Sequence, residues 1–163
     1  MQRYGMGQAP GVNNPMLPMG VEGDPNVIAT DFYNYSVFFT NLAPNTSATT
    51  SLQIEADSDF EIVKLQQFTI SDAAEATPQI STNQVPDVTV LLTDTGSGRQ
   101  LMNIALPISN IFGSGTLPFI LPRTKRLFAR STLSVQVTNL NTADTYAYIY
   151  LTFSGKKIFT RGQ

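Results

Sequence analysis

Apolar and polar residues alternate along most of the chain after residue 25. An alternation of period two puts apolar side chains on one face of an extended strand and polar side chains on the other, as in a half-buried strand. The clearest case is residues 132–138, where Leu133, Val135 and Val137 alternate with threonine, serine and glutamine. The same alternation predicts strands over residues 33–40, 51–56 and 88–93.

The remaining segments predict how these strands are joined. Residues 60–70 have a strand-like composition but lose the alternation near Lys64 and Leu65, which predicts a bulge or a bend. Residues 43–46, 95–98 and 139–142 read as turns, the last two closing hairpins. One helical turn is predicted over residues 72–76, ended by Pro78. Seven or eight strands with almost no helix predict a single β-sandwich of jelly-roll type over residues 26–163.

The first 25 residues differ from the rest of the chain. Glycine or proline occurs nine times among them, which excludes a helix or a central strand. Four of the five methionines also lie here, and flexible thioethers fit irregular grooves. We therefore predict that residues 1–25 form an extended arm that binds along a partner surface. The side chains expected to make this contact are Tyr4, Met6, Val12, Met16, Leu17 and Met19.

The composition removes most of the common catalytic sites. The 163 residues contain no histidine and no cysteine, so Ser-His-Asp and Cys-His sites, cysteine zinc sites and disulfides are excluded. Only 13% of the residues are charged, about half the usual ~25%, and such a surface costs little to desolvate against a partner. We predict no enzymatic activity, no catalytic residue, no metal and no cofactor. No segment approaches the ~20 apolar residues that span a membrane, so no membrane partner is expected.

The net charge of −2 conceals an asymmetry along the chain. Residues 1–95 hold 11 acidic and 2 basic residues, whereas residues 96–163 hold 1 acidic and 8 basic residues. Strands from the two parts could interleave, in which case the charges cancel within the domain. Alternatively, the subunit is bipolar and its acidic side contacts the basic side of a neighbour.

Glu55, Asp57, Asp59 and Glu61 are spaced two residues apart. In one extended strand their carboxylates would share a face, and oxygen-rich clusters suit Ca²⁺. The spacing does not match a twelve-residue calcium loop, so we interpret this segment as a turn in which Asp57 and Asp59 bond to nearby backbone. A cation site and an acidic contact surface are the alternatives.

The basic cluster comprises Arg123, Lys125, Arg126 and Arg130. Phosphate binding requires positive charge of this kind, with aromatic residues on which bases can stack. The chain as a whole is acidic, however, and lacks the basic excess of nucleic-acid-binding proteins. We therefore expect no nucleic acid and assign these four residues to contact with a carboxylate-rich protein partner, with ordinary solvated charge as the alternative.

Tyr146, Tyr148 and Tyr150 alternate with apolar residues near the C-terminus. A row of tyrosines can stack against sugar rings, which makes a glycan-binding module one alternative function. More often such a row forms a sheet face or a subunit contact, because tyrosine buries a large area and keeps a polar tip.

Two stretches carry a resemblance to a known class of proteins. One is residues 52–60, LQIEADSDF, and the other runs from residues 117–123, LPFILPR, through STLSVQVTN at 131–139 to YLTFSGK at 150–156. Over residues 33–157 the chain resembles small all-β virion proteins of tailed bacteriophages, which decorate or cement capsids or sit at the head–tail junction. The resemblance supplies no individual functional residues.

The resemblance implies a structural role in the virion. We expect a capsid cement or decoration subunit that bridges shell subunits through its arm and its sandwich. Its partners would be the major capsid protein or other virion subunits, and we expect a homo-oligomer, with a trimer favoured. It would reside in the phage particle, and in the host cytoplasm during assembly. A head–tail junction, tail or baseplate component is the alternative within this class.

Overall fold

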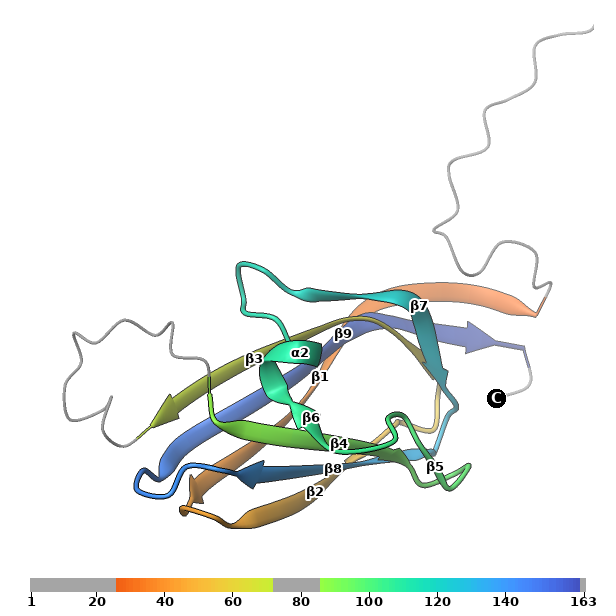
Figure 1. The fold of residues 1–163 in the computed structure, drawn as a ribbon. Helices are drawn as coiled ribbons and strands as arrows, with labels where there is room; N and C mark the ends of the chain where they lie inside the picture. The colour runs from red at the N-terminus through yellow and green to blue at the C-terminus, as the bar shows by residue number, and fades with distance from the viewer. Residues whose placement is uncertain (1–25, 72–85, 162–163) are drawn as a thin grey trace, which may run out of the picture.

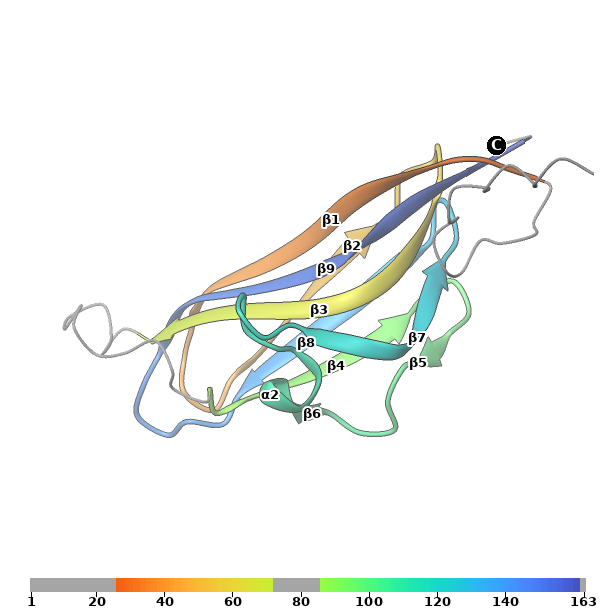
Figure 2. The same ribbon diagram turned by 90° about the horizontal axis from the view of Figure 1, so that it is seen from above.

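The computed structural model describes residues 26–71 and 86–161. These residues form two packed antiparallel sheets, as Figures 1 and 2 show. The predicted arm over residues 1–25 and the predicted helical turn over residues 72–76 lie outside the described residues.

Four strands form sheet A, in the order β1-β9-β3-β7. Their bounds are Val27–Leu42 for β1, Tyr146–Thr160 for β9, Asp59–Ser71 for β3 and Phe119–Leu127 for β7. Sheet B has the order β2-β8-β4-β5, and β6 also pairs with β4. Its strands are Ser47–Gln53, Thr132–Asn139, Val88–Asp94, Arg99–Gln100 and, for β6, Leu106–Pro107.

The strand order is that of a jelly roll, as predicted. β1 pairs with β9, β2 with β8 and β3 with β7, so the pairings are nested from the two ends of the described chain inward. All of these pairings are antiparallel, and successive pairs alternate between the two sheets. A jelly roll is a two-sheet sandwich whose strands are paired in this nested order. One four-residue helix, α2 (Ile108–Ile111), follows β6 and was not predicted from the sequence. Among the described residues, no helix has the length and hydropathy needed to cross a membrane.

The alternation seen in the sequence defines the core between the sheets. In β8, Leu133, Val135 and Val137 are fully buried. Sheet A contributes the odd-numbered side chains of β1 and β9 to the same core. The central ones among these buried side chains are Tyr35, Val37, Phe39, Ile149, Leu151 and Phe153.

The predicted irregularity in residues 60–70 is a β-bulge. The register of β3 against both β9 and β7 shifts between Ile62 and Lys64. At this point the backbone of β3 approaches Gly155 of β9 so closely that a Cβ atom there would lie 1.9 Å from the carbonyl oxygen of Glu61. Glycine at 155 therefore permits the close approach of the two backbones at the bulge.

The prediction of a hairpin at residues 139–142 is wrong. β8 and β9 lie in different sheets, so the segment between them is a connection across the end of the sandwich. The buried Asn139 side chain organises this end, because its Nδ2 donates hydrogen bonds to the carbonyl oxygens of Leu42 and Asp144 at 3.1 and 2.9 Å. Its Oδ1 accepts a hydrogen bond from the Asn141 backbone N–H at 2.9 Å. The hairpin at residues 95–98 is confirmed, since Asp94 pairs with Arg99.

We predict that Gly155→Ala destabilises the domain by about 2–3 kcal/mol, because the added methyl group collides with backbone that cannot move without opening the bulge. Gly115→Ala is the matched control, since a Cβ atom there meets no atom within 4 Å, and we expect a change within about 0.5 kcal/mol. Urea unfolding followed by circular dichroism measures both. Equal stability of the two variants would contradict this account of Gly155.

Candidate binding face and the charged end

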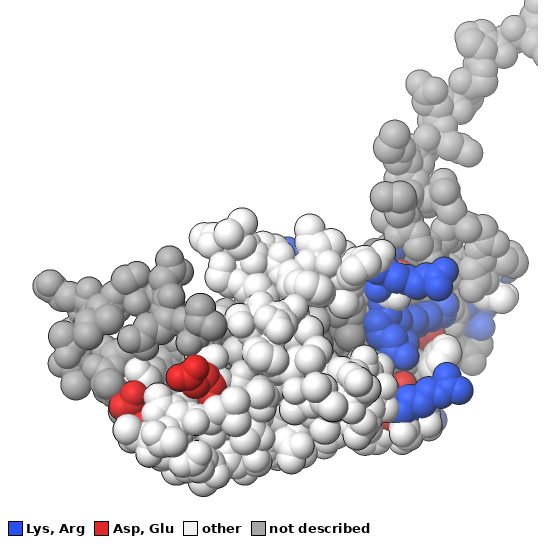
Figure 3. Space-filling model, in the orientation of Figure 1, with Lys and Arg blue, Asp and Glu red and all other residues white. Residues whose placement is uncertain are grey.

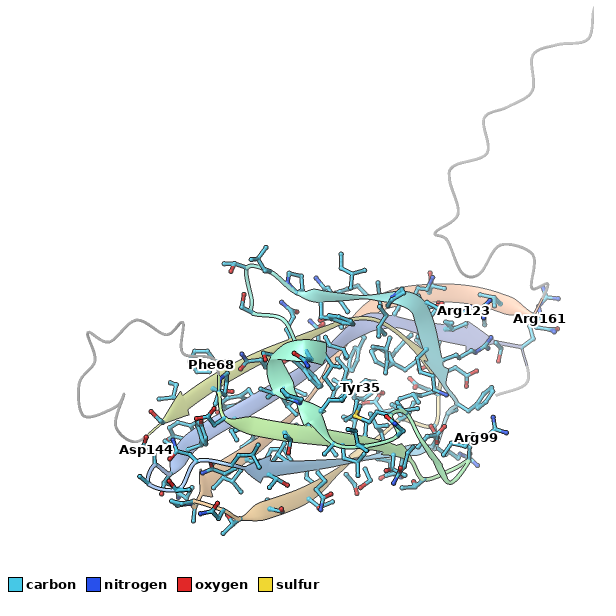
Figure 4. The ribbon with its side chains drawn as sticks, in the orientation of Figure 1. Tyr35, Phe68, Arg99, Arg123, Asp144 and Arg161 are labelled. Carbon is cyan, nitrogen blue, oxygen red and sulfur yellow. The ribbon has the colours of Figure 1, made fainter. Side chains whose placement is uncertain are left out.

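Basic residues gather at one end of the sandwich. Figure 3 shows Lys and Arg side chains clustered there with acidic side chains between them. The middle of the described surface is uncharged in this view, and acidic patches lie at the other end. In Figure 4, Arg99, Arg123 and Arg161 lie at this end and Asp144 lies at the opposite one. We call this region the charged end, formed by residues 55–61, 94, 123–126 and 156–157.

The acidic segment at residues 55–61 begins in a turn between β2 and β3, as predicted, but the predicted bonding of Asp57 to nearby backbone is wrong, because its partners are side chains. Residues 56 and 57 form the turn, and Ser58 donates a side-chain hydrogen bond to Asp57 Oδ1 at 2.9 Å. Beside it, the buried ammonium group of Lys157 bonds to Glu55 and lies 3.6 Å from Asp57 Oδ1. The same ammonium lies 4.4 Å from the centre of the Tyr33 ring, a cation–π contact.

Asp59 and Glu61 continue into β3 and are buried. Asp59 accepts hydrogen bonds from Arg126 Nε at 2.8 Å and from the Ala129 backbone N–H at 2.7 Å. Glu61 accepts a hydrogen bond from the Thr124 hydroxyl through Oε1. Its Oε2 lies 3.1 Å from Lys156 Nζ, an ionic contact without hydrogen-bond alignment.

These contacts decide between the two interpretations of the charge asymmetry. Each ion pair joins an acid from the first part of the chain to a base from the second, including Asp94 to Lys125 at 3.8 Å. Interleaving of strands therefore cancels much of the asymmetry within the domain. In the described ranges, no group of three or more acidic side chains is arranged to hold a metal ion.

The four predicted basic contact residues have different surroundings. Lys125 and Arg126 are half-buried and paired with Asp94 and Asp59. Arg123 and Arg130 are exposed, and no described acidic residue lies within ion-pair distance of either. Contact with a partner is therefore open to these two side chains. The six predicted contact residues of the arm, from Tyr4 to Met19, lie outside the described residues.

Burial and neighbouring charges change the proton affinities of three groups. Burial raises the pKa of Tyr35 and of Tyr146 above 10.0. Burial alone would lower the pKa of Lys157, but its hydrogen bond to Glu55 and the nearby Tyr35 and Asp57 raise that pKa above 10.5 overall. Each group therefore holds its proton more tightly in the folded chain than in the unfolded chain.

The outer face of sheet A carries a row of exposed aromatic side chains. In the register of the sheet, Tyr150 of β9 lies between Phe38 of β1 and Phe68 of β3. The Tyr150 ring stacks on Phe38 with centroids 5.8 Å apart, and lies 6.3 Å from Phe68 and 6.4 Å from Tyr148. Phe38 is 62% exposed, Phe68 49% and Tyr150 40%. We call these four residues the aromatic row.

A shallow hollow adjoins the aromatic row. It is lined by residues that include Gln66, Phe68, Tyr150 and Thr152. A second hollow lies farther along sheet A over the bulge at Gly155, and its lining combines Phe32 with the charged residues Asp31, Lys64 and Lys156. Exposed aromatic side chains beside a hollow are typical of a protein contact site, because partner side chains can enter it.

The tyrosine row predicted from the sequence is only partly present. Tyr148 and Tyr150 are exposed on the outer face, but Tyr146 is buried and its hydroxyl accepts a hydrogen bond from the Asp87 backbone N–H at 2.9 Å. Sequence reasoning missed Phe38 and Phe68. The signal for Phe38 was its position among Asn34, Ser36 and Thr40 on the polar side of a strand, where a large aromatic residue is unusual.

A scan against models of known protein families found no match, and a search of curated proteins found no relative.

We predict that Arg126→Gln and Lys125→Gln differ in their effect on stability. Arg126→Gln leaves the buried Asp59 carboxylate without its ionic partner, and we expect a loss of about 1–3 kcal/mol. Lys125→Gln removes a long, half-exposed ion pair worth about 0.5 kcal/mol or less. Chemical denaturation of both variants measures the difference. An equal loss would show that Asp59 does not need the guanidinium group of Arg126.

We also predict that stability falls in alkali. Because the pKa values of Tyr35, Tyr146 and Lys157 are raised on folding, their contributions are fully present below about pH 10 and are lost as the pH rises through the folded values. Thermal melts from pH 8 to above pH 11 should show Tm falling above about pH 10. Tyr35→Phe and Tyr146→Phe should each reduce that slope, whereas an unchanged slope in both variants would contradict the assignment.

Proposed function

We propose that the chain is a non-enzymatic structural subunit of a bacteriophage head, of the cement or decoration type. The observation that carries the proposal is the aromatic row with its adjoining hollow on the outer face of sheet A. Four exposed aromatic side chains in contact on a sheet surface offer a large apolar area, and removing that area from water stabilises association. The residues that flank the row in the register of the sheet are uncharged, so little charge opposes burial of the row. They are Ser36, Thr40, Gln66, Ile70 and Thr152.

The architecture is compatible with this role. Jelly rolls occur in viral capsid proteins and in lectins, so the fold narrows the choice without determining it. The sandwich would contact the shell through the outer face of sheet A. The arm over residues 1–25 would add contacts to neighbouring subunits, and its backbone ordering, which costs about 1–2 kcal/mol per residue, would be offset by burial of its apolar side chains.

The test measures occupancy on particles assembled without the chain. We expect deletion of residues 1–25 to leave the melting temperature of the domain unchanged and to reduce occupancy at least about tenfold, because a cluster of contact side chains is lost. We expect the same reduction for Phe68→Ser/Tyr150→Ser. Bound copies are counted by gel densitometry and by electron microscopy of the particles.

Thr49→Ala is the matched control, because Thr49 is exposed on β2 in the opposite sheet. It should bind particles as the parent chain does. Unchanged occupancy of both the deletion and the Phe68/Tyr150 variant would contradict the proposed function.

Binding of glycans is a second candidate, favoured by the stacked pair Tyr148 and Tyr150 on an exposed face. Flat aromatic rings can stack against sugar rings, and their hydroxyl groups can hydrogen-bond to them. A glycan array with Tyr148→Ala as the comparison separates the candidates. Specific glycan binding that is lost in the variant would support the second function over the first.

A further inference from the structure

β1 is a long edge strand without the usual protection. It has 16 residues and, within the described part of the chain, its only strand partner is β9. A free edge exposes a row of backbone N–H and C=O groups that can pair with another strand, and natural proteins protect such edges with lysine, proline, bulges or short length. β1 contains no lysine and no proline, its one register shift is at its start, and Asp31 is its only charged residue.

The other edges of the described sandwich are shorter or better protected. β7, at the opposite edge of sheet A, contains Pro122 and the basic residues Arg123, Lys125 and Arg126. In sheet B, β5 and β6 have two residues each. The edge strand β2 also lacks lysine, proline and charge, but it has seven residues, fewer than half the number in β1. Among the described edge strands, β1 is therefore the longest one without protection.

We propose that β1 pairs antiparallel with β1 of a second copy of this chain, around a two-fold axis that passes beside Tyr35. Side chains alternate between the two faces of a strand, so opposed residues must both point outward or both point inward if the cores of the two copies are to stay on the same side. A pairing centred on Tyr35 satisfies this condition and overlaps residues 28–42 of both strands. It places Phe32 opposite Phe38 of the second copy, and Phe38 opposite Phe32.

The exposed side chains of β1 are self-complementary in this register. Phe32 is 70% exposed and Phe38 62%, and each is three residues from Tyr35, so the pairing forms two symmetric cross-strand aromatic pairs. Asp31 would lie opposite Phe39, so no like charges oppose each other. The Phe32 and Phe38 rings would bury roughly 250 Å² on each copy. This is about a third of the area that one partner buries in a standard interface. The backbone edges of fifteen paired residues would add to it.

This pairing would enlarge the exposed aromatic surface on the outer face of sheet A. The two copies of sheet A become one eight-stranded sheet, and their aromatic rows lie on one continuous surface. A dimer that presents two such rows binds a shell with higher avidity than a monomer does, because the second contact is intramolecular. The pairing itself needs no shell, and it can be tested without any particle.

The experiment uses the purified full-length chain. Because the chain contains no cysteine, introduced thiols report only the designed contact. In the proposed register Asn34, an exposed residue, lies opposite Ser36 of the second copy, at a separation that a disulfide can span. We expect Asn34→Cys/Ser36→Cys to form a covalent dimer on mild oxidation, and sedimentation of the parent chain to give a dimer.

Thr40→Cys is the matched control, because Thr40 is also exposed but lies about ten residues along the strand from its own copy in the proposed register. It should stay monomeric on a non-reducing gel. Phe32→Glu/Phe38→Glu should convert the parent dimer to a monomer with an unchanged circular dichroism spectrum. A monomer or a trimer in sedimentation, or a dimer in which the Asn34/Ser36 variant fails to cross-link, would overturn the proposal.

Discussion

The pairing of β1 with β9 is the interaction on which the remaining structure depends. The ladder runs from Val27 opposite Thr160 to Leu42 opposite Tyr146, so the two ends of the described chain must meet before the roll is complete. β9 then carries β3 on its other side, and these three strands present one apolar face to sheet B. Contacts between segments so distant in sequence require closure of long loops, which is the slow and entropically costly part of forming a jelly roll.

The nested pairing of the strands also determines which acidic and basic residues meet. Residues 55–61 follow β2, and Lys156 and Lys157 lie late in β9, yet the roll brings them together at one end. Asp59 and Glu61 are buried there, and each needs its base to offset the cost of desolvation. Several of the few charged residues of this protein thus form ion pairs within the domain. The outer face of sheet A around the aromatic row would contact a partner mainly through apolar side chains.

Much of the fold could be predicted from the sequence, because strands with one buried face have a period of two. Leu133, Val135 and Val137 are as buried as their alternation indicates. Alternation does not reveal which strand is the neighbour, and for this reason the sequence predicts a hairpin at residues 139–142 that the structure does not contain. Tyr146 has the spacing of Tyr148 and Tyr150, but the register of β3 against β9 shifts beside it and its hydroxyl turns to Asp87. Phe38 and Phe68 come together only through pairing with Tyr150, and no local pattern contains that information.

The backbone N–H of Arg161 donates a hydrogen bond to the carbonyl oxygen of Asn26, so the first and last described residues leave the sandwich side by side (Figure 1). Asn139 and the connection to β9 lie at the far end, where Asp144 is seen in Figure 4. A peptide or reporter domain fused directly after residue 161 would thus emerge beside residue 26. Insertion between residues 141 and 144 would place such cargo at the opposite pole of the sandwich, far from residues 26 and 161.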